Sequence, residues 1–301
     1  MVAGVLGWLL TRSAAVADDP LRTKVRIAIT FDDLPGSAEL PRGYDSERLI
    51  SELIDALKAH DVKNATGFVI GSRLAVDPSG EEALKLWADA GYEFGNHSYS
   101  HRSFADIGNG YFTDLASWEP TMRALEQEAD QRLRFFRYPY LQEGRDVVER
   151  KLLSSGLTQL GYTLARVSLD FRDWEWADAY NRCLDHNDAS SEATLSLSYL
   201  EYARANLSWT LATTDALFER PLTHVLLLHA NVATARNMDA LLTAYERKGA
   251  EFVTLGQALA DPIYTAEYAG REGTLLQLVS TEQGRPLPPE PPRPSLALTC
   301  P

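Results

Sequence analysis

Positive charge is scarce in this sequence: 29 lysines and arginines stand against 42 aspartates and glutamates, giving a net charge of −13 over 301 residues. This balance argues against nucleic acid or an anionic membrane surface as a partner, and a neutral substrate suits it better. Long hydrophobic runs are also missing after the N-terminus, so no stable membrane insertion is expected. Cysteine is limited to Cys183 and Cys300, which are compatible with one disulfide or with two separate thiols.

Residues 1–17 have the pattern of a signal peptide. The run from Val2 to Leu10 is apolar, and Ala15-Val16-Ala17 offers the small residues that a signal peptidase recognises. A basic segment before the apolar run is missing, so a short disordered or packed N-terminal extension is the alternative. We expect an exported protein, either periplasmic or secreted.

Residues 24–260 alternate short apolar runs with amphipathic helical patterns, which is typical of parallel βα units. We predict one α/β domain, a distorted or incomplete (β/α) barrel of about seven parallel strands with outer helices. Residues 175–221 break the rhythm as a long helical excursion, and residues 262–301 form an irregular, Pro-rich C-terminal arm. The strands are expected at Val25–Thr30, Ala65–Ile70, Tyr92–Gly95, Phe135–Tyr138, Thr163–Leu169, His224–Leu228 and Glu251–Val253.

Two histidines, His97 and His101, follow the third expected strand at a spacing of four residues. About one helical turn between them lets both imidazoles face one divalent metal. Asp32 and Asp33 end the first strand, and two adjacent carboxylates there are costly unless a cation lies beside them. Taken singly, the histidine pair is compatible with a surface feature and the aspartate pair with a turn or helix cap. Together they make the inventory of a hydrolytic metal site.

Further polar residues follow other strands at the same end of the predicted barrel. Arg137-Tyr138-Pro139-Tyr140 comes after the fourth strand, and Asp170-Phe171-Arg172-Asp173-Trp174 after the fifth. The sixth strand ends at Leu227-Leu228-His229. In parallel α/β folds the chemistry lies at the C-terminal ends of the strands, so we expect these residues to share one site.

These five segments, with Thr30-Phe31-Asp32-Asp33 first and His97-Ser98-Tyr99-Ser100-His101 second, resemble the motifs of the polysaccharide deacetylase family, carbohydrate esterase family 4. The resemblance covers about residues 24–259. It implies a divalent metal cofactor, with Zn²⁺ expected and Co²⁺ or Mn²⁺ as alternatives. The ligands that it implies are Asp33, His97 and His101.

The resemblance also implies a role for each remaining motif residue. Asp32 is similar to the general base, and Arg137 to the residue that tethers it. His229 resembles the general acid, oriented and tuned by Asp170, while Asp173 faces Arg137. The backbone N–H of Tyr140 resembles an oxyanion-hole donor, and the side chains of Tyr140 and Trp174 contact the substrate, Trp174 as a wall of the acetyl pocket.

The resulting hypothesis is a metal-dependent hydrolase that removes acetyl groups from a glycan, from N-acetylated amino sugars or from O-acetylated sugars. Two alternatives remain open. Leu34 and Leu141 stand where the family often has glycine, and both are expected to place bulk near the mouth of the cleft. With the excursion they favour a closed pocket for a small-molecule amidohydrolase. A metal-retaining glycan-binding protein without turnover is the other alternative. Against it, the sequence has a candidate residue for the base, the acid, the tether and the tuning carboxylate.

Overall fold

The computed structural model describes residues 24–37, 39–268, 272–296 and 300. The predicted signal peptide at residues 1–17 lies outside the described residues. Within the described part of the chain, none of the helices is both long and apolar enough to span a membrane.

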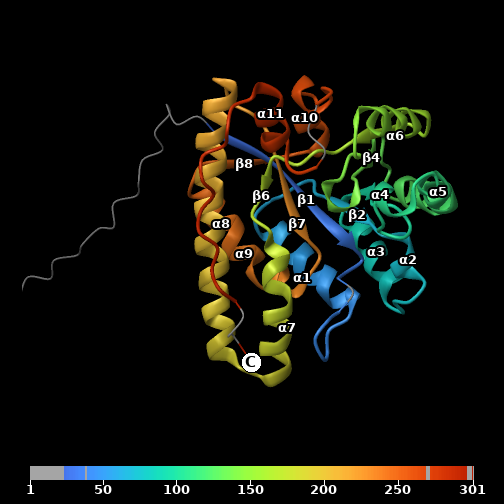
Figure 1. Ribbon diagram of the computed structural model, residues 1–301. Helices are drawn as coiled ribbons and strands as arrows, with labels where there is room; N and C mark the ends of the chain where they lie inside the picture. Colours follow the sequence, from blue (N-terminus) through green and yellow to red (C-terminus); the bar gives the residue numbers. More distant parts are fainter. Residues whose placement is uncertain (1–23, 38, 269–271, 297–299, 301) are drawn as a thin grey trace, which may run out of the picture.

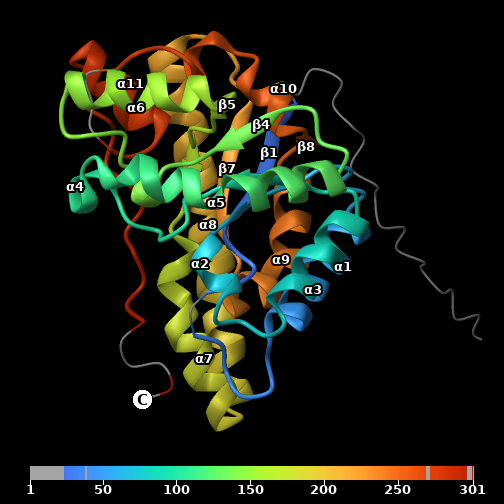
Figure 2. The same ribbon diagram turned by 90° about the vertical axis from the view of Figure 1, so that its right-hand side faces the viewer.

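Parallel strands form the centre of the molecule, with helices around them (Figures 1 and 2). The described residues form eight strands, seven of which follow the order β5-β4-β3-β2-β1-β7-β6, while β8 pairs with the N-terminal half of β1. This arrangement confirms the predicted distorted barrel of about seven parallel strands. The strands are β1 Val25–Leu34, β2 Thr66–Val69, β3 Glu93–Asn96, β4 Arg134–Phe136, β5 Tyr162–Leu164, β6 Leu169–Asp170, β7 His224–His229 and β8 Ala250–Val253.

The single strand expected at Thr163–Leu169 is wrong, because the structure divides this segment between β5 and β6. β5 pairs with β4 and β6 pairs with β7, so the two short strands lie at opposite edges of the sheet. The few residues between them can span only about 3.3 Å each, which holds the two edges close together. The sheet is therefore rolled almost into a barrel without closing.

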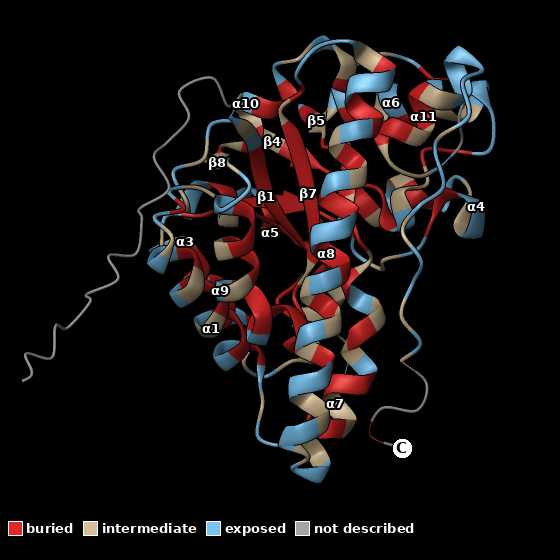
Figure 3. Ribbon diagram, turned by 90° about the vertical axis from the view of Figure 1, so that its left-hand side faces the viewer, coloured by how far each residue is buried: buried red, intermediate tan, exposed pale blue. Residues whose placement is uncertain are grey.

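Helices cover the strands and bury both faces of β1, as the coloring by burial shows (Figure 3). Ile27 and Ala28, successive residues that point to opposite faces of β1, are both buried, as a strand enclosed by helices requires. In the first helix, Asp45 caps the N-terminus by accepting a hydrogen bond from Arg48 N, and leucines on one face pack into the core. The helices are α1 Ser46–Ala59, α2 Gly71–Leu74, α3 Gly80–Asp89, α4 Phe104–Ile107, α5 Gly110–Glu128, α6 Val147–Gln159, α7 Ala177–His186, α8 Ala189–Phe218, α9 Val232–Glu246, α10 Leu255–Leu259 and α11 Leu275–Gln283.

The predicted helical excursion is present as α7 and the 30-residue helix α8. Buried residues of α8 recur at helical spacing, among them Leu195, Tyr199, Tyr202 and Asn206. Tyr199 packs edge-on against Phe171, just after β6, with ring centroids 5.1 Å apart. This contact fixes α8 beside the C-terminal end of the barrel.

The C-terminal segment differs from the irregular arm that the sequence predicted. It contains α11, whose leucines are buried in a second core cluster, and then runs alongside α8 (Figure 1). Arg285 donates to the carbonyl of Ala216 at 2.6 Å, and the indole nitrogen of Trp209 donates to the carbonyl of Pro288 at 3.2 Å. The apolar pattern of α11 is only nine residues long, which made it hard to recognise beside the prolines that follow.

A disulfide between Cys183 of α7 and Cys300 joins the C-terminal segment to the excursion. Its Cα atoms are 5.2 Å apart and its cysteines are 117 positions apart in sequence. A cross-link over so long a loop restricts the unfolded chain strongly.

We expect Cys183→Ser to lower the free energy of unfolding by about 2–5 kcal/mol relative to the oxidised protein. Denaturant titrations of the two proteins, followed by circular dichroism, measure this difference. Cys300→Ser serves as the matched control and should give the same loss. The absence of a loss in both variants would show that the disulfide does not stabilise the fold.

Candidate active site

Five strands place the polar motif residues at one end of the barrel. Asp32 and Asp33 lie in the last part of β1, and Asp32 is level with His229, the last residue of β7, in the parallel pairing. His97 directly follows β3, and Arg137 directly follows β4. Because the carboxyl ends of parallel strands meet at one edge, residues distant in sequence converge here.

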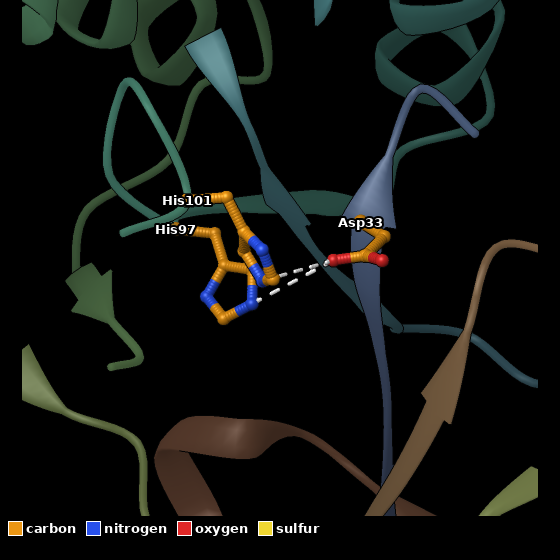
Figure 4. Close-up of side chains that lie close together, drawn as sticks. All are labelled: Asp33, His97 and His101. Atoms are coloured by element: carbon orange, nitrogen blue, oxygen red, sulfur yellow. Dashed lines mark ion pairs between the residues drawn. The ribbon is translucent and has the colours of Figure 1, made fainter. Parts of the chain in front are cut away.

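Asp33, His97 and His101 form a compact cluster (Figure 4). Oδ1 of Asp33 lies 3.8 Å from Nε2 of His97 and 3.5 Å from Nε2 of His101. Two atoms that bind one zinc ion at about 2.0–2.2 Å each can be no more than about 4 Å apart, so these separations fit a shared metal. Asp33 and His101 both adopt positive φ, 72° and 54°, which is a strained backbone conformation for these residues.

The electrostatic surroundings put these groups in the state that a metal requires. Burial opposes ionisation of Asp33, but the neighbouring charges, His229 first and then Arg73, outweigh it and hold its pKa below the usual value. Burial and the neighbouring His97 lower the pKa of His101 to about 4, so its imidazole is neutral near pH 7. A deprotonated carboxylate and a neutral imidazole are metal ligands without further proton loss.

One oxygen of Asp33 supports the metal assignment directly. Its Oδ1 is buried and has no hydrogen-bond partner among the described residues, which is costly for a carboxylate oxygen. The second oxygen, Oδ2, lies 3.3 Å from Nη2 of Arg73 of α2, and Nη1 of the same side chain donates to the carbonyl of Gly36. A cation at Oδ1 would satisfy the orphan oxygen, so the residues present fit the metal.

A backbone carbonyl group fixes the orientation of the His97 ring. Its Nδ1 lies 2.9 Å from the carbonyl oxygen of Arg137, which can only accept a hydrogen bond. The Nδ1 therefore carries the proton, and Nε2 is left with a lone pair that faces Asp33.

Asp32 is held by Arg137, as the sequence predicted. Nη1 of Arg137 donates to Oδ1 of Asp32 at 2.6 Å and to the hydroxyl of Thr30 at 2.9 Å, and all three residues are buried. The other oxygen, Oδ2, lies 3.5 Å from Nε2 of His97 and so borders the metal cluster. The guanidinium also lies 4.0 Å from the ring centroid of Phe68, which fixes its plane.

His229 is paired with Asp173, which corrects the predicted partner Asp170. Nδ1 of His229 lies 2.8 Å from Oδ1 of Asp173, and the backbone N–H of His229 donates to Oδ2 at 2.8 Å. Burial alone would lower the pKa of His229, but Asp173, with Asp33 and Asp32, raises it to about 10. Asp173 is fully buried and also accepts from the hydroxyl of Thr234 at 2.5 Å.

Asp170 has different neighbours. Its Oδ1 accepts from the backbone N–H of Arg172 at 2.7 Å, and burial raises its pKa to about 6. The expectation that Asp173 faces Arg137 is also wrong, since Arg137 donates to Asp32, Thr30 and the carbonyl of Ala165. The 3₁₀ turn at Asp173–Trp176, entered through a left-handed Arg172, turns Asp173 toward β7.

The two predicted substrate-contacting aromatics are exposed near these groups. The ring of Tyr140 lies 4.8 Å from that of His101, centroid to centroid, and Tyr140 has a left-handed backbone with φ of 59°. Trp174 is half exposed, with the guanidinium of Arg172 4.9 Å from its ring centroid. Leu34, expected at the mouth of the cleft, is instead fully buried against Gly67, where an added Cβ would meet its side chain at 2.2 Å.

Several residues of the site gave no signal in the sequence. Arg73 belongs to a four-residue helix with no recognisable motif, although its charge could be expected to pair with an acid. Thr234 and Asn231 lie at the start of α9, where they support Asp173 as well as the helix N-terminus. Asn231 is an N-cap, so a helix-start pattern could have located it but not its contact with Asp173.

Parallel strands with a histidine–aspartate cluster at their carboxyl ends define an α/β-barrel protein with a candidate metal centre. Residues 21–164 match the sequence model of the polysaccharide deacetylase family. This match confirms the resemblance to the family that the motifs indicated.

Two curated relatives show how much of the chain is shared. A peptidoglycan-N-acetylglucosamine deacetylase of Bacillus cereus is 29% identical over 157 residues, which cover 52% of this chain and 49% of that protein. The deacetylase PgdA of Listeria monocytogenes is 24% identical over 261 residues, covering 84% of this chain and 43% of that protein. The chain therefore spans less than half of the length of these relatives.

Solved structures share the fold. A polysaccharide deacetylase from Bacillus cereus superposes with a TM-score of 0.52 at 22% identity, covering 77% of this chain and 92% of that chain. A CE4 family pseudoenzyme from Bacillus anthracis gives 0.53 at 17% identity, covering 79% and 66%. Because an enzyme and a pseudoenzyme share this fold, the fold does not decide activity, which depends on the groups in the site.

Proposed function

We propose that this chain is a metal-dependent deacetylase that hydrolyses N-acetyl groups on a carbohydrate, giving acetate and a free amine. The observation that carries the proposal is the complete set of groups at one end of the barrel. Asp33, His97 and His101 form a cluster of metal-ligand geometry, and two further groups, Asp32 and His229, flank it. A binding protein without turnover would have no need for both flanking groups.

The metal held by Asp33, His97 and His101 would supply a Lewis acid, with Zn²⁺ expected and Co²⁺ or Mn²⁺ as alternatives. The choice of Zn²⁺ follows from two imidazoles and one carboxylate, since nitrogen-rich sets suit zinc.

Each remaining group has a task in the hydrolysis of the amide. Asp32, fixed by Arg137, takes the proton of the attacking water as that water forms a bond with the acetyl carbon. His229, held by Asp173 through Nδ1, presents Nε2 and gives its proton to the leaving nitrogen as the C–N bond breaks. The backbone N–H of Tyr140 donates to the developing oxyanion, a contact typically worth about 3 kcal/mol. An O-acetyl ester would be cleaved by the same steps.

Export to the periplasm or beyond the cell is part of the proposal. The disulfide between Cys183 and Cys300 supports it, because disulfides persist in oxidising compartments. The two curated relatives are deacetylases of peptidoglycan, a cell-wall polymer, which also supports it.

The testing experiment is acetate release with and without a chelator. The panel holds N-acetylglucosamine oligomers, peptidoglycan, acetylated xylan and small N-acyl amides. Chelation should abolish release and added Zn²⁺ should restore it, because the attacking water would need the Lewis acid that Asp33, His97 and His101 would hold.

Two outcomes would contradict the proposal. Release that is indifferent to metal would rule out the metal mechanism. Metal binding without release from any glycan would leave a small-molecule amidohydrolase if N-acyl amides are cleaved, or a glycan-binding protein if nothing is cleaved.

A further inference from the structure

The two histidines of the metal cluster lie on a loop rather than on a helix. Residues 97–101 leave β3 without forming a helical turn, and Ser98 and His101 have left-handed backbone conformations with φ of 67° and 54°. Non-glycine residues rarely adopt this conformation unless the surrounding structure imposes it. The convergence of His97 and His101 on Asp33, visible in Figure 4, therefore depends on the contacts that hold this loop.

Side chains satisfy most of the backbone N–H groups of the loop. The N–H of His97 donates to the carbonyl of Val69 at 3.0 Å, as in a continued strand. Backbone donors that find no carbonyl need another acceptor, so the acceptors chosen decide the shape of such a loop. The remaining N–H groups donate to side chains: Ser98 to Oδ1 of Asn96 at 2.8 Å, Tyr99 and Ser100 to Oδ2 of Asp114 at 2.9 and 3.3 Å, and His101 to Oγ of Ser98 at 3.0 Å.

Asp114 is the acceptor that comes from outside the loop and its strand. It belongs to α5, it is partly buried, and one of its oxygens accepts from both Tyr99 and Ser100, which lie between the two histidines. Hydrogen bonds from N–H groups to a carboxylate are shorter and stronger than those between neutral groups. Asp114 therefore restrains the middle of the loop.

A buried chain of hydrogen bonds ties the start of the loop to the same helix. Nδ2 of Asn96 donates to the hydroxyl of Tyr162 at 2.9 Å, and this hydroxyl donates to Oε2 of Glu119 of α5 at 2.8 Å. Nη2 of Arg134 donates to the same hydroxyl at 2.8 Å, so its donor and both acceptor positions are used. Since Oδ1 of Asn96 accepts from Ser98, α5 holds the loop at two points.

We propose that Asp114 is a positioning residue of the metal site. It holds residues 97–101 in the conformation in which both imidazoles face Asp33, and Tyr162 supports the same loop from its start. The inference rests on the proposed metal-dependent function and adds that α5 sets the affinity for the ion. Ligands that are already in place lose less freedom when the ion binds, so the groups that hold them contribute to affinity.

The test is the affinity of the metal-free protein for Zn²⁺, measured by competition with a chromophoric chelator. Asp114→Ala removes the acceptor of two N–H groups and should raise the Kd by about 10- to 100-fold, the usual effect of losing a group that supports a metal ligand. Asp114→Asn keeps an acceptor oxygen and should raise the Kd less. A Kd for Asp114→Ala equal to that of the wild type would overturn the proposal.

The matched control is Glu128→Ala, which removes an exposed acid from the same helix. Its Kd should equal that of the wild type, and a rise as large as that of Asp114→Ala would overturn the proposal, because the charge of α5 rather than the contact would then set the affinity. Denaturant titration of the metal-free proteins separates positioning from stability. A lower free energy of unfolding in Asp114→Ala with an unchanged Kd would overturn the positioning role.

Tyr162→Phe tests the second point of attachment. It keeps the ring, over which the guanidinium of Arg134 lies at 4.1 Å from the centroid, and removes the hydroxyl that joins Asn96 to Glu119. The Kd should rise, but less than in Asp114→Ala, because the direct contacts of the loop remain. If Asp114→Ala does not fold, an unchanged Kd in both Asp114→Asn and Tyr162→Phe would overturn the proposal.

Failure of the proposed function is distinguishable from failure of this inference, since the Kd is measured without substrate. If Zn²⁺ binds but no acetate is released, the deacetylase function is wrong, and the order of the Kd values still decides the role of Asp114. If acetate is released and the Kd values are equal, the function stands and the positioning role is overturned. A wild-type protein that binds no Zn²⁺ would overturn both.

Discussion

Asp32→Asn should lower kcat for acetate release by about 10²- to 10⁴-fold, the usual contribution of a general base, and leave the metal content unchanged. Asparagine keeps the shape of the side chain but cannot take a proton from water. The metal cluster itself is formed by Asp33, His97 and His101, so it keeps its ligands in the variant. Kinetics on an N-acetylated oligomer, together with metal analysis of the purified protein, measure both quantities.

The matched control is His101→Ala, which removes a proposed ligand and should lose both the metal and the activity. His101 is partly exposed and belongs to no core cluster, so its removal should leave the fold intact. A near-normal rate in Asp32→Asn would refute the base assignment. Loss of metal in Asp32→Asn would show instead that Asp32 is a metal ligand. Its Oδ2 lies 3.5 Å from Nε2 of His97, which is close enough for both atoms to bind one ion.

The end of the barrel at which the site lies could be predicted from the sequence. Parallel strands all point the same way, so a polar residue that follows an apolar run falls at the same edge as every other such residue. Asp32, His97, Arg137 and His229 lie at or just beyond the ends of four different strands, and the structure brings all four together. The alternation of apolar strands with helices is sufficient for this prediction, because the prediction requires no knowledge of where the side chains point.

The partners of the two aspartates after β6 could not be predicted in this way. Asp170 and Asp173 are three residues apart, and the direction of the second depends on the backbone between them. The left-handed conformation of Arg172 and the 3₁₀ turn that follows direct Asp173 toward His229. Arg172 is a non-glycine residue at φ of 59°, and tertiary contacts rather than local preference impose such a conformation.

Long-range packing also explains the other differences between the structure and the features predicted from the sequence. Leu34 follows the paired aspartates, where the motif indicated the cleft mouth, but it is buried because β1 continues four residues beyond its predicted end. The contact of Arg73 with Asp33 joins positions 40 apart, and no local pattern connects them. α11 is stabilised by burial of its leucines against the barrel, which its short pattern alone does not reveal.

Asp173→Asn should lower kcat by about 10²- to 10⁴-fold, by analogy with the loss found when the carboxylate that orients a catalytic histidine is replaced by an amide. Asparagine removes the charge beside His229 and can present its NH₂ group to Nδ1, which favours the wrong tautomer. The prediction also has a direction in pH. His229 must be protonated to act as an acid, so activity falls as pH rises through its pKa.

Burial lowers the pKa of His229, but Asp173, together with Asp33 and Asp32, raises it to about 10. Without the charge of Asp173 the pKa falls, so the alkaline limb of the kcat profile should move to lower pH. A bound cation lowers the pKa in both proteins and therefore leaves the direction of the difference unchanged. Asp170→Asn is the control: Asp170 accepts from Arg172 N rather than from His229, so its alkaline limb should move less. A larger shift in Asp170→Asn than in Asp173→Asn would restore the pairing that the motifs first suggested and would contradict the geometry in which Asp173 holds the acid.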